Sequence, residues 1–148
     1  GEARAYSPGH SVPIFHFKGW NIALFVCYDL RFPVWSRNVG LRYDLALYVA
    51  NWPEPRIAVW DTLLTARALE NQAYVCGVNR VGTDENGLRY NGHSALISPR
   101  GERQLFLSAP RETVETASID LHTLRRFREK FPVWKDADRF QIIPPQNP

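Results

Sequence analysis

Cys27 is the residue whose sequence surroundings best suit covalent chemistry. It closes a nearly unbroken apolar run, residues 20–27, and is followed by the polar side chains of Tyr28 and Asp29. A thiolate is a strong nucleophile, but a free thiol with a pKa of about 8.5 is only a few per cent ionised at neutral pH. A reactive Cys27 therefore needs a base or a cation nearby. A cysteine in this position can equally be a small core residue, and spacing alone leaves both interpretations open.

The other reactive side chains fit structural roles better. Cys76 lies inside an apolar stretch without a polar neighbour. None of the four histidines shows the spacing of a metal ligand beside a cysteine or a glutamate, so we predict no metal and no cofactor. Arg67 and Glu70 are three residues apart on a predicted helix, which favours an ion pair within that helix or at an interface. Lys18 falls between two predicted strands, in a turn that points into solvent.

Long apolar runs predict the strands that position Cys27. Near-continuous apolar runs are typical of strands buried on both faces, and they occur at residues 20–27, 44–50 and 74–81. Residues 12–17 come just before the first run, and Lys18-Gly19 between them predicts a hairpin with a two-residue turn. Shorter strands are predicted at residues 94–97, 104–107 and 115–121.

Predicted helices alternate with these strands, at residues 34–41, 57–73 and 122–130. The first begins after Pro33, and the last ends before Pro132. This alternation predicts an α/β fold in which helices cover a sheet. An elbow from strand to helix at Cys27 would lie at the carboxyl edge of the sheet, where open α/β folds bind their ligands. Free backbone N–H groups in such an elbow can donate to a developing oxyanion.

Composition excludes several classes of protein. The 148 residues suffice for one core, and 13% aromatic residues argue against disorder. No apolar run is long enough to span a membrane, and the net charge of +3 is scattered apart from residues 125–128, so neither membrane nor nucleic-acid binding is predicted. Two cysteines and no signal-peptide pattern predict a cytoplasmic location. Because the sequence contains no methionine, we expect it to be a piece of a longer chain.

A series of motifs resembles the nitrilase superfamily, the carbon–nitrogen hydrolases. The stretch CYDLRFP at residues 27–33 resembles the nucleophile motif of that superfamily, and Glu2 to Gly9 resembles its E-x-x-x-Y-x-x-G segment. Further segments match in the same order, at residues 51–53, 67–74, 79–82, 92–101 and 127–132. Within the superfamily, residues 27–37 and 48–53 are most similar to bacterial omega-amidases, which act on the ω-amides of 2-oxo acids.

The resemblance implies an αββα four-layer sandwich that pairs into a homodimer. Residues 1–140 would form the C-terminal portion of a single hydrolase domain, truncated at its N-terminus, and residues 141–148 a flexible tail. The superfamily uses a Glu–Lys–Cys triad, often with a second glutamate. By position Cys27 takes the role of the nucleophile and Glu2 that of the second glutamate. The triad glutamate and lysine would lie upstream of Glu2, outside this chain, so we expect this chain to be inactive alone.

The implied activity is hydrolysis of a small 2-oxo dicarboxylic acid monoamide, such as 2-oxoglutaramate or 2-oxosuccinamate, through a thioester on Cys27. The backbone N–H of Tyr28 would help to stabilise the oxyanion. Asn51, Trp52 and Arg56 are predicted to bind the substrate, with Arg56 facing its carboxylate. For Trp52 a place in the core, and for Arg56 a place in solvent, are equally open. Nitriles, N-carbamoyl compounds and aliphatic amides are alternative substrates, and a non-catalytic module that binds a partner is the alternative class.

Overall fold

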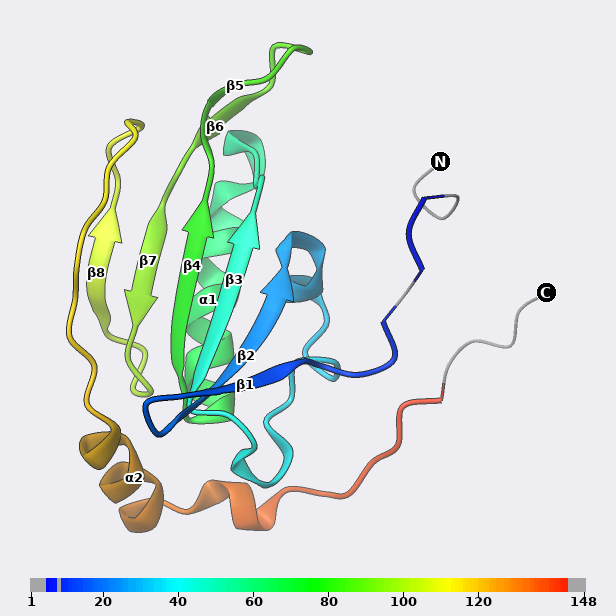
Figure 1. The fold of residues 1–148 in the computed structure, drawn as a ribbon, viewed down its shortest axis with the longest axis vertical. Helices are drawn as coiled ribbons and strands as arrows, with labels where there is room; N and C mark the ends of the chain where they lie inside the picture. The colour runs from blue at the N-terminus through cyan, green and yellow to red at the C-terminus, as the bar shows by residue number, and fades with distance from the viewer. Residues whose placement is uncertain (1–4, 8, 144–148) are drawn as a thin grey trace.

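The computed structural model describes residues 5–7 and 9–143, which form a mixed sheet packed against one long helix (Figure 1). The main sheet has six strands in the order β1-β2-β3-β4-β7-β8. Their bounds are Ile14–Phe17 for β1, Trp20–Val26 for β2, Leu45–Ala50 for β3, Tyr74–Asn79 for β4, Ser94–Ile97 for β7 and Arg103–Leu107 for β8. A separate two-stranded ribbon consists of β5 (Val81–Thr83) and β6 (Arg89–Asn91). The α-helices are α1 (Ile57–Asn71) and α2 (Leu121–Lys130).

Strands β2, β3 and β4 run parallel in the centre of the sheet. Val26 at the end of β2 pairs with Val49, and Ala50 at the end of β3 pairs with Asn79 at the end of β4. The three carboxyl ends therefore meet at one edge, the top of the sheet in Figure 1, where the β5–β6 ribbon projects beyond it. The outer strands β1, β7 and β8 pair antiparallel.

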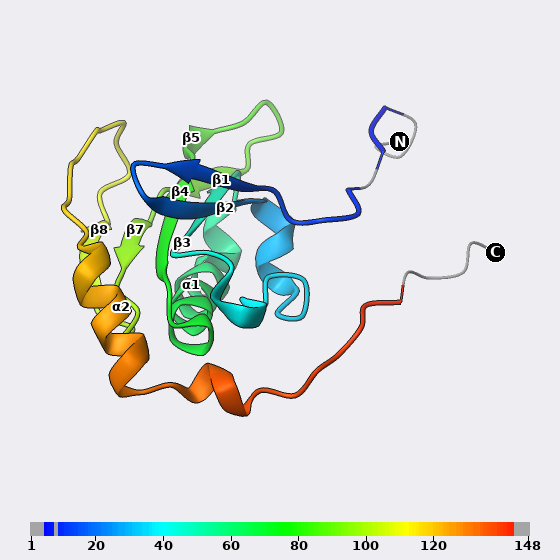
Figure 2. The same cartoon turned by 60° about the horizontal axis from the view of Figure 1, so that its bottom comes forward.

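Helix α1 covers one face of the sheet and supplies much of the core (Figures 1 and 2). The side chains of Trp60, Leu64 and Ala68 on its inner side are fully buried. Gly77 in β4 is the point of closest approach, because a Cβ atom there would lie 2.5 Å from Leu64 Cδ1. The absence of a side chain in the strand thus lets the helix pack directly on the sheet.

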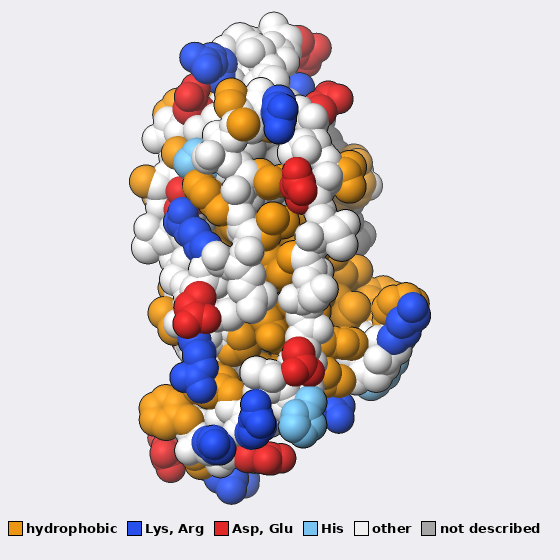
Figure 3. All heavy atoms as spheres, turned by 90° about the vertical axis from the view of Figure 1, so that its left-hand side faces the viewer, with side chains coloured by type: hydrophobic (Ala, Val, Ile, Leu, Met, Phe, Trp, Pro, Cys, Tyr) orange, Lys and Arg blue, Asp and Glu red, His pale blue; other side chains and the backbone are white. Residues whose placement is uncertain are grey.

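The opposite face of the sheet carries apolar side chains that are open to solvent. Val26, Val49 and Val78, one from each parallel strand, are 63%, 46% and 48% exposed. Among the segments that the structure describes, no helix covers this face (Figure 2). Apolar groups are also visible between scattered charged ones on the β8 side of the molecule (Figure 3). A helix on one face and open apolar side chains on the other are what one half of the predicted αββα sandwich requires.

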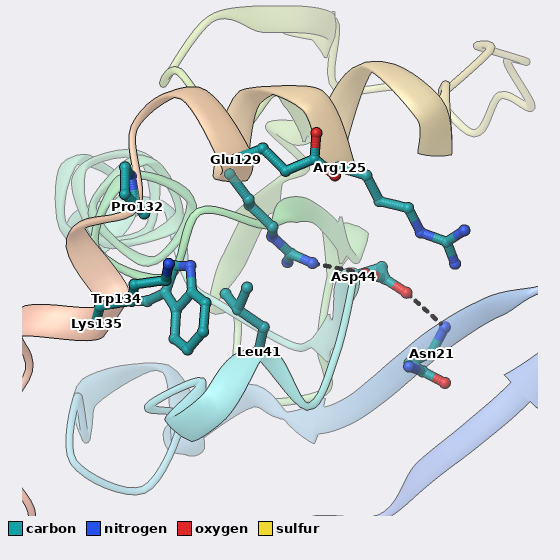
Figure 4. Close-up of a pocket in the computed structure, with 9 residues that line it drawn as sticks. Asn21, Leu41, Asp44, Arg125, Glu129, Pro132, Trp134 and Lys135 are labelled. Atoms are coloured by element: carbon teal, nitrogen blue, oxygen red, sulfur yellow. Dashed lines mark hydrogen bonds and ion pairs between the residues drawn. The ribbon is translucent and has the colours of Figure 1, made fainter.

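Helix α2 is fixed to the amino-terminal edge of the sheet by a buried ion pair. Arg128 Nη1 lies 2.7 Å from Asp44 Oδ1, and both side chains are less than 8% exposed. The other two nitrogens of the Arg128 guanidinium donate to the backbone carbonyls of Gln72 and Tyr43, each at 2.8 Å. Asp44 Oδ2 in turn accepts from the backbone N–H of Asn21, at 3.0 Å, as Figure 4 shows. The hollow of about 420 Å³ beside this pair lies at the opposite end of the parallel strands from Cys27.

Two predicted elements are wrong. Residues 34–41 do not form a helix but a turn and a short 3₁₀-helix, Val39–Leu41, in which Gly40 and Leu41 have φ values of +64° and +56°. The buried side chain of Asn38 bonds the backbone N–H and carbonyl of Tyr43, which replaces helical hydrogen bonding. Residues 115–121 do not form a strand. Their alternating side chains are not buried against the sheet, and among the strands described β8 pairs only with β7.

The remaining predicted elements are confirmed with small shifts at their ends. The helix over residues 57–73 ends at Asn71, where Gln72 takes a left-handed conformation with φ of +46°. The turn at Lys18 and Gly19 is confirmed, and Lys18 is exposed there. Strand β6 was not predicted. Residues 141–143 have no regular structure, and residues 144–148 lie outside the described part of the chain. No described helix is long and apolar enough to cross a membrane.

Replacing Arg128 with methionine in the complete protein should lower the free energy of unfolding by about 3 kcal/mol or more, because removal of one partner leaves the other charge buried and unpaired. Chemical denaturation measures this change. Arg126, exposed on the same helix, provides the control, since Arg126→Met should change the free energy by less than about 0.5 kcal/mol. Equal effects of the two substitutions would contradict a structural role for the buried pair.

Candidate active site

Cys27 lies on a tight turn immediately after β2. It is the first residue of the 3₁₀-helix Cys27–Arg31, and its φ of +39° lies in the left-handed region that non-glycine residues seldom adopt. Asp29 stabilises this turn with two hydrogen bonds. Its carboxylate accepts a hydrogen bond from the N–H of Val26 at 2.9 Å, and its backbone carbonyl accepts one from the N–H of Phe32 at 3.0 Å. Unusual backbone conformations that the surroundings hold in place are frequent at active sites. The chain therefore turns sharply at Cys27 as predicted, but it enters a 3₁₀-helix at residues 27–31 and not the predicted helix at residues 34–41.

Helix α1 supports the elbow from beneath. The fully buried Leu30 offers its carbonyl oxygen to Arg67 Nη2 at 2.6 Å. Arg67 also pairs with Glu70, with 2.9 Å between Nη1 and Oε1. The predicted Arg67–Glu70 ion pair is thus confirmed as a pair within one helix, and Arg67 links this helix to the backbone of the elbow. The side of the elbow that faces the core is held by hydrogen bonds as well as by packing.

Two hollows meet at Cys27. The larger, of about 500 Å³, opens on the apolar sheet face and is lined by Val26, Cys27, Val49, Ala50, Asn51, Val78, Asn79 and Arg80. The smaller, of about 350 Å³, lies on the side of the elbow and is lined by Cys27, Tyr28, Arg31, Asn51, Trp52, Pro53 and Arg56. Both contain Cys27 and Asn51, since these residues follow neighbouring parallel strands. We call the smaller hollow the Trp52 hollow.

The structure brings five of the six predicted site residues together around the Trp52 hollow. Cys27, Tyr28, Asn51, Trp52 and Arg56 all line it, although they come from two segments of the chain. Glu2, the sixth, lies outside the described residues. Trp52 is only 3% exposed and lies in the core, and it also borders the hollow. Arg56 is exposed at the rim.

Arg31 is a residue of the hollow that sequence reasoning did not select. Its guanidinium carbon lies 4.9 Å from the centre of the Trp52 ring, a distance at which a cation is attracted to the aromatic face. Asp29, two residues before Arg31, bonds the backbone of the turn. The sequence places Arg31 four residues after Cys27, which was the available sign of a position near the site. This spacing alone does not show that the 3₁₀-helix with Arg31 and the loop after β3 line the same hollow.

The charged side chains that line the two hollows are cationic. Arg31 and Arg56 border the Trp52 hollow and Arg80 borders the larger one, whereas no acidic side chain lines either hollow among the described residues. Cys76 lines neither hollow, and burial raises the pKa of its thiol. The described residues include no cluster of histidine, cysteine and acidic side chains that could hold a metal ion.

The sheet and its covering helix define an α/β protein, and Cys27 is its candidate reactive residue. The family model described as carbon-nitrogen hydrolase matches residues 2–129. The chain therefore belongs to the carbon–nitrogen hydrolase family, as its motifs predict. The match includes the elbow, the loop after β3, helix α1 and most of α2.

Individual relatives are similar over most of this chain. It is 55% identical over 137 residues to omega-amidase YafV of Escherichia coli K12, which covers 93% of this chain and 53% of that protein. It is 37% identical over 131 residues to the 2-oxoglutaramate amidase of Bacillus subtilis, with 88% and 50% covered. The chain thus spans about half the length of the curated relatives that it matches.

A solved structure shares the fold as well as the sequence. XC1258 of Xanthomonas campestris, described as a CN-hydrolase superfamily protein with an arsenic adduct in its active site, superposes with a TM-score of 0.89. It is 43% identical, and the match covers 95% of this chain and 56% of that one. The two-layer arrangement of sheet and helix described above is therefore a part of the nitrilase-type sandwich.

Alkylation should distinguish the two cysteines. At pH 7 iodoacetamide should modify Cys27 at least about tenfold faster than Cys76, because a thiol whose pKa is raised has a smaller thiolate fraction. The reaction of Cys76 should set in only at higher pH, since its pKa lies above that of a free thiol. Mass spectrometry of the two peptides measures both rates, and in denaturant the rates should become equal. Faster reaction of Cys76 in the folded protein would contradict this assignment.

Proposed function

We propose that the complete protein hydrolyses the ω-amide of a small 2-oxo dicarboxylic acid monoamide, such as 2-oxoglutaramate or 2-oxosuccinamate, to the acid and ammonia. The observation that carries the proposal is the position of Cys27, on an elbow that borders a hollow with two arginines. The names of the E. coli and B. subtilis relatives support this substrate class. In this proposal residues 1–140 form the C-terminal portion of one hydrolase domain.

The mechanism begins at Cys27. Its Sγ atom attacks the amide carbonyl, and the carbonyl oxygen becomes an oxyanion. Tyr28 follows Cys27 at the start of the 3₁₀-helix, where backbone N–H groups lack a partner within the helix, so its N–H can donate to that oxyanion. Ammonia leaves with a proton from a general acid, and water then hydrolyses the thioester. Since no acidic side chain lines the hollows among the described residues, the proton-transferring group is expected outside them.

The two arginines of the Trp52 hollow suit a substrate with a carboxylate at the end away from the amide. A guanidinium can bind a carboxylate with two parallel hydrogen bonds, which gives both affinity and orientation. Arg31 is the better placed of the two, because it is half-buried and its guanidinium packs on the Trp52 indole. Arg56 is exposed, and its backbone carbonyl accepts a hydrogen bond from Trp52 Nε1 at 2.8 Å. We therefore assign the main role in carboxylate binding to Arg31 and a smaller one to Arg56.

The complete protein should release ammonia from 2-oxoglutaramate, and Cys27→Ala should abolish this release, because no nucleophile remains to form the thioester. A coupled ammonia assay measures the activity. Cys76→Ala is the matched control and should leave kcat unchanged, since Cys76 lines neither hollow. Full activity of Cys27→Ala would refute the assignment of the nucleophile.

Preference for a nitrile, an N-carbamoyl compound or a plain aliphatic amide in the same assay would refute the substrate class. Inactivity on all of these compounds and on 2-oxoglutaramate would favour a non-catalytic module.

Replacing Arg31 with glutamine should raise KM for 2-oxoglutaramate by about ten- to a hundredfold, the effect of losing one charged hydrogen bond. Arg56→Gln should raise KM by a smaller factor because the side chain is exposed. Steady-state kinetics with 2-oxoglutaramate and with a neutral aliphatic amide separate the two contributions. The neutral amide should be insensitive to both changes. A larger effect of Arg56→Gln would reverse the assignment of the two arginines.

A homodimer in the cytoplasm completes the proposal. The family resemblance supports pairing of two copies of the complete protein, and light scattering of that protein measures its mass. Both cysteines are free thiols in this structure, a state suited to a reducing compartment. The substrate is a small molecule, and the proposal includes neither a nucleic acid nor a membrane.

A further inference from the structure

Asn79 is a buried polar residue that borders the larger hollow, and its side chain bonds the loop after β3. It is the last residue of β4 and only 7% exposed. Its Oδ1 accepts from the backbone N–H of Trp52 at 2.7 Å, and its Nδ2 donates to the carbonyl of Trp52 at 3.0 Å. The same Nδ2 donates to the carbonyl of Gly92 at 2.7 Å. One amide thus bonds both backbone groups of Trp52 and ties them to the turn before β7.

These bonds occur where the regular sheet can no longer hold the chain. The ladder between β3 and β4 ends at Ala50, whose carbonyl accepts from the N–H of Arg80 at 3.0 Å. Beyond that point Pro53 and Pro55 have no N–H to donate. The side-chain amide of Asn79 supplies the hydrogen bonds to Trp52 that a further pair of residues in the β3–β4 ladder would supply. These bonds fix the position of Trp52 relative to the ends of the strands.

Trp52 supports the side chain of Arg31, whose backbone belongs to the same 3₁₀-helix as Cys27. The guanidinium of Arg31 lies 4.9 Å from the centre of the Trp52 ring, and the Trp60 ring lies 5.6 Å from it in the core. A shift of the Trp52 backbone would move the surface on which the guanidinium packs, while Cys27 and the Arg31 backbone would stay in place on the elbow. The position of the guanidinium relative to Cys27 therefore depends on Asn79.

We propose that Asn79 is a positioning residue that sets substrate selectivity, because it holds Trp52, and through Trp52 the guanidinium of Arg31, at the distance from Cys27 that a carboxylate-bearing substrate requires. This inference rests on the proposed function for the identity of that substrate. It concerns a residue whose side-chain amide is bonded to the backbone of Trp52 and Gly92. Its effect should appear in the recognition of anionic molecules and leave the thiol itself unchanged.

Ser94 offers a matched control at the same place in the sheet. Its Oγ accepts from the backbone N–H of Asn79 at 2.9 Å and donates to the Asn79 carbonyl at 3.3 Å. Ser94→Ala therefore removes hydrogen bonds to Asn79 without touching the loop that carries Trp52. A general loss of stability around β4 should affect Ser94→Ala and Asn79→Ala alike, whereas a positioning role should affect Asn79→Ala alone.

The test compares two alkylating agents on the complete protein. Iodoacetate carries a carboxylate and iodoacetamide does not, and with both the thiolate of Cys27 forms a C–S bond while iodide leaves. The ratio of the two rates, followed by mass spectrometry of the Cys27 peptide, reports the cation near the thiol independently of turnover. We expect Asn79→Ala to lower the iodoacetate-to-iodoacetamide ratio by about tenfold and to leave the iodoacetamide rate within about twofold. Ser94→Ala should keep the ratio of the unmodified protein.

Kinetics provide the second measurement. Asn79→Ala should raise KM for 2-oxoglutaramate by about ten- to a hundredfold, with kcat changed less than KM, because misplacement of a binding group by about 1 Å has effects of this size. An unchanged alkylation ratio in Asn79→Ala, or the same change in Ser94→Ala, would overturn the proposal. If Asn79→Ala does not fold, the neutral variant Asn79→Leu removes the same hydrogen bonds with a side chain of similar volume, and it should lower the ratio in the same way.

The two proposals can fail separately. If the unmodified protein releases no ammonia from 2-oxoglutaramate, the proposed function is wrong, and the alkylation ratio still tests whether Asn79 positions the cation. If ammonia is released and the ratio does not respond to Asn79→Ala, the function stands and the role of Asn79 is wrong.

Discussion

The parallel pairing of β2, β3 and β4 is the constraint on which the site depends. Neighbouring strands lie about 4.8 Å apart, and the register pairs Val26 with Val49 and Ala50 with Asn79. The residues that follow the three strands are therefore brought to one edge, although they are separated by more than twenty positions in the chain. Without this register Cys27 would end a strand with no neighbouring loop to form a hollow beside it.

Polar side chains continue the support where the backbone leaves the sheet. Asp29 bonds the N–H of Val26, Arg67 bonds the carbonyl of Leu30, and Asn79 bonds both backbone groups of Trp52. Each provides a partner for backbone groups that the regular ladder no longer satisfies. Arg67 and Asn79 are buried, where leaving such a group unpaired is costly, so these two side chains hold the elbow and the loop in fixed positions.

The open face of the sheet and the larger hollow share Val26, Val49 and Val78. The apolar wall of the larger hollow is thus part of the open sheet face, whereas its polar wall, with Asn51, Asn79 and Arg80, belongs to the edge where the parallel strands end.

The sequence by itself determined the central strands, the long helix and the elbow at Cys27, because continuous apolar runs, helical spacing and a polar residue at the end of a run are local signals. The prediction of a helix at residues 34–41 failed because the side chain of Asn38 replaces helical hydrogen bonds there. The prediction of a strand at residues 115–121 failed because the alternating apolar side chains of this segment are not buried against the sheet. Only the tertiary structure decided that Arg31 packs on Trp52 and that Asn79 holds Trp52. The physical reason is that these contacts join segments 21 and 27 residues apart, and their geometry follows from strand register, which no local pattern of side chains encodes.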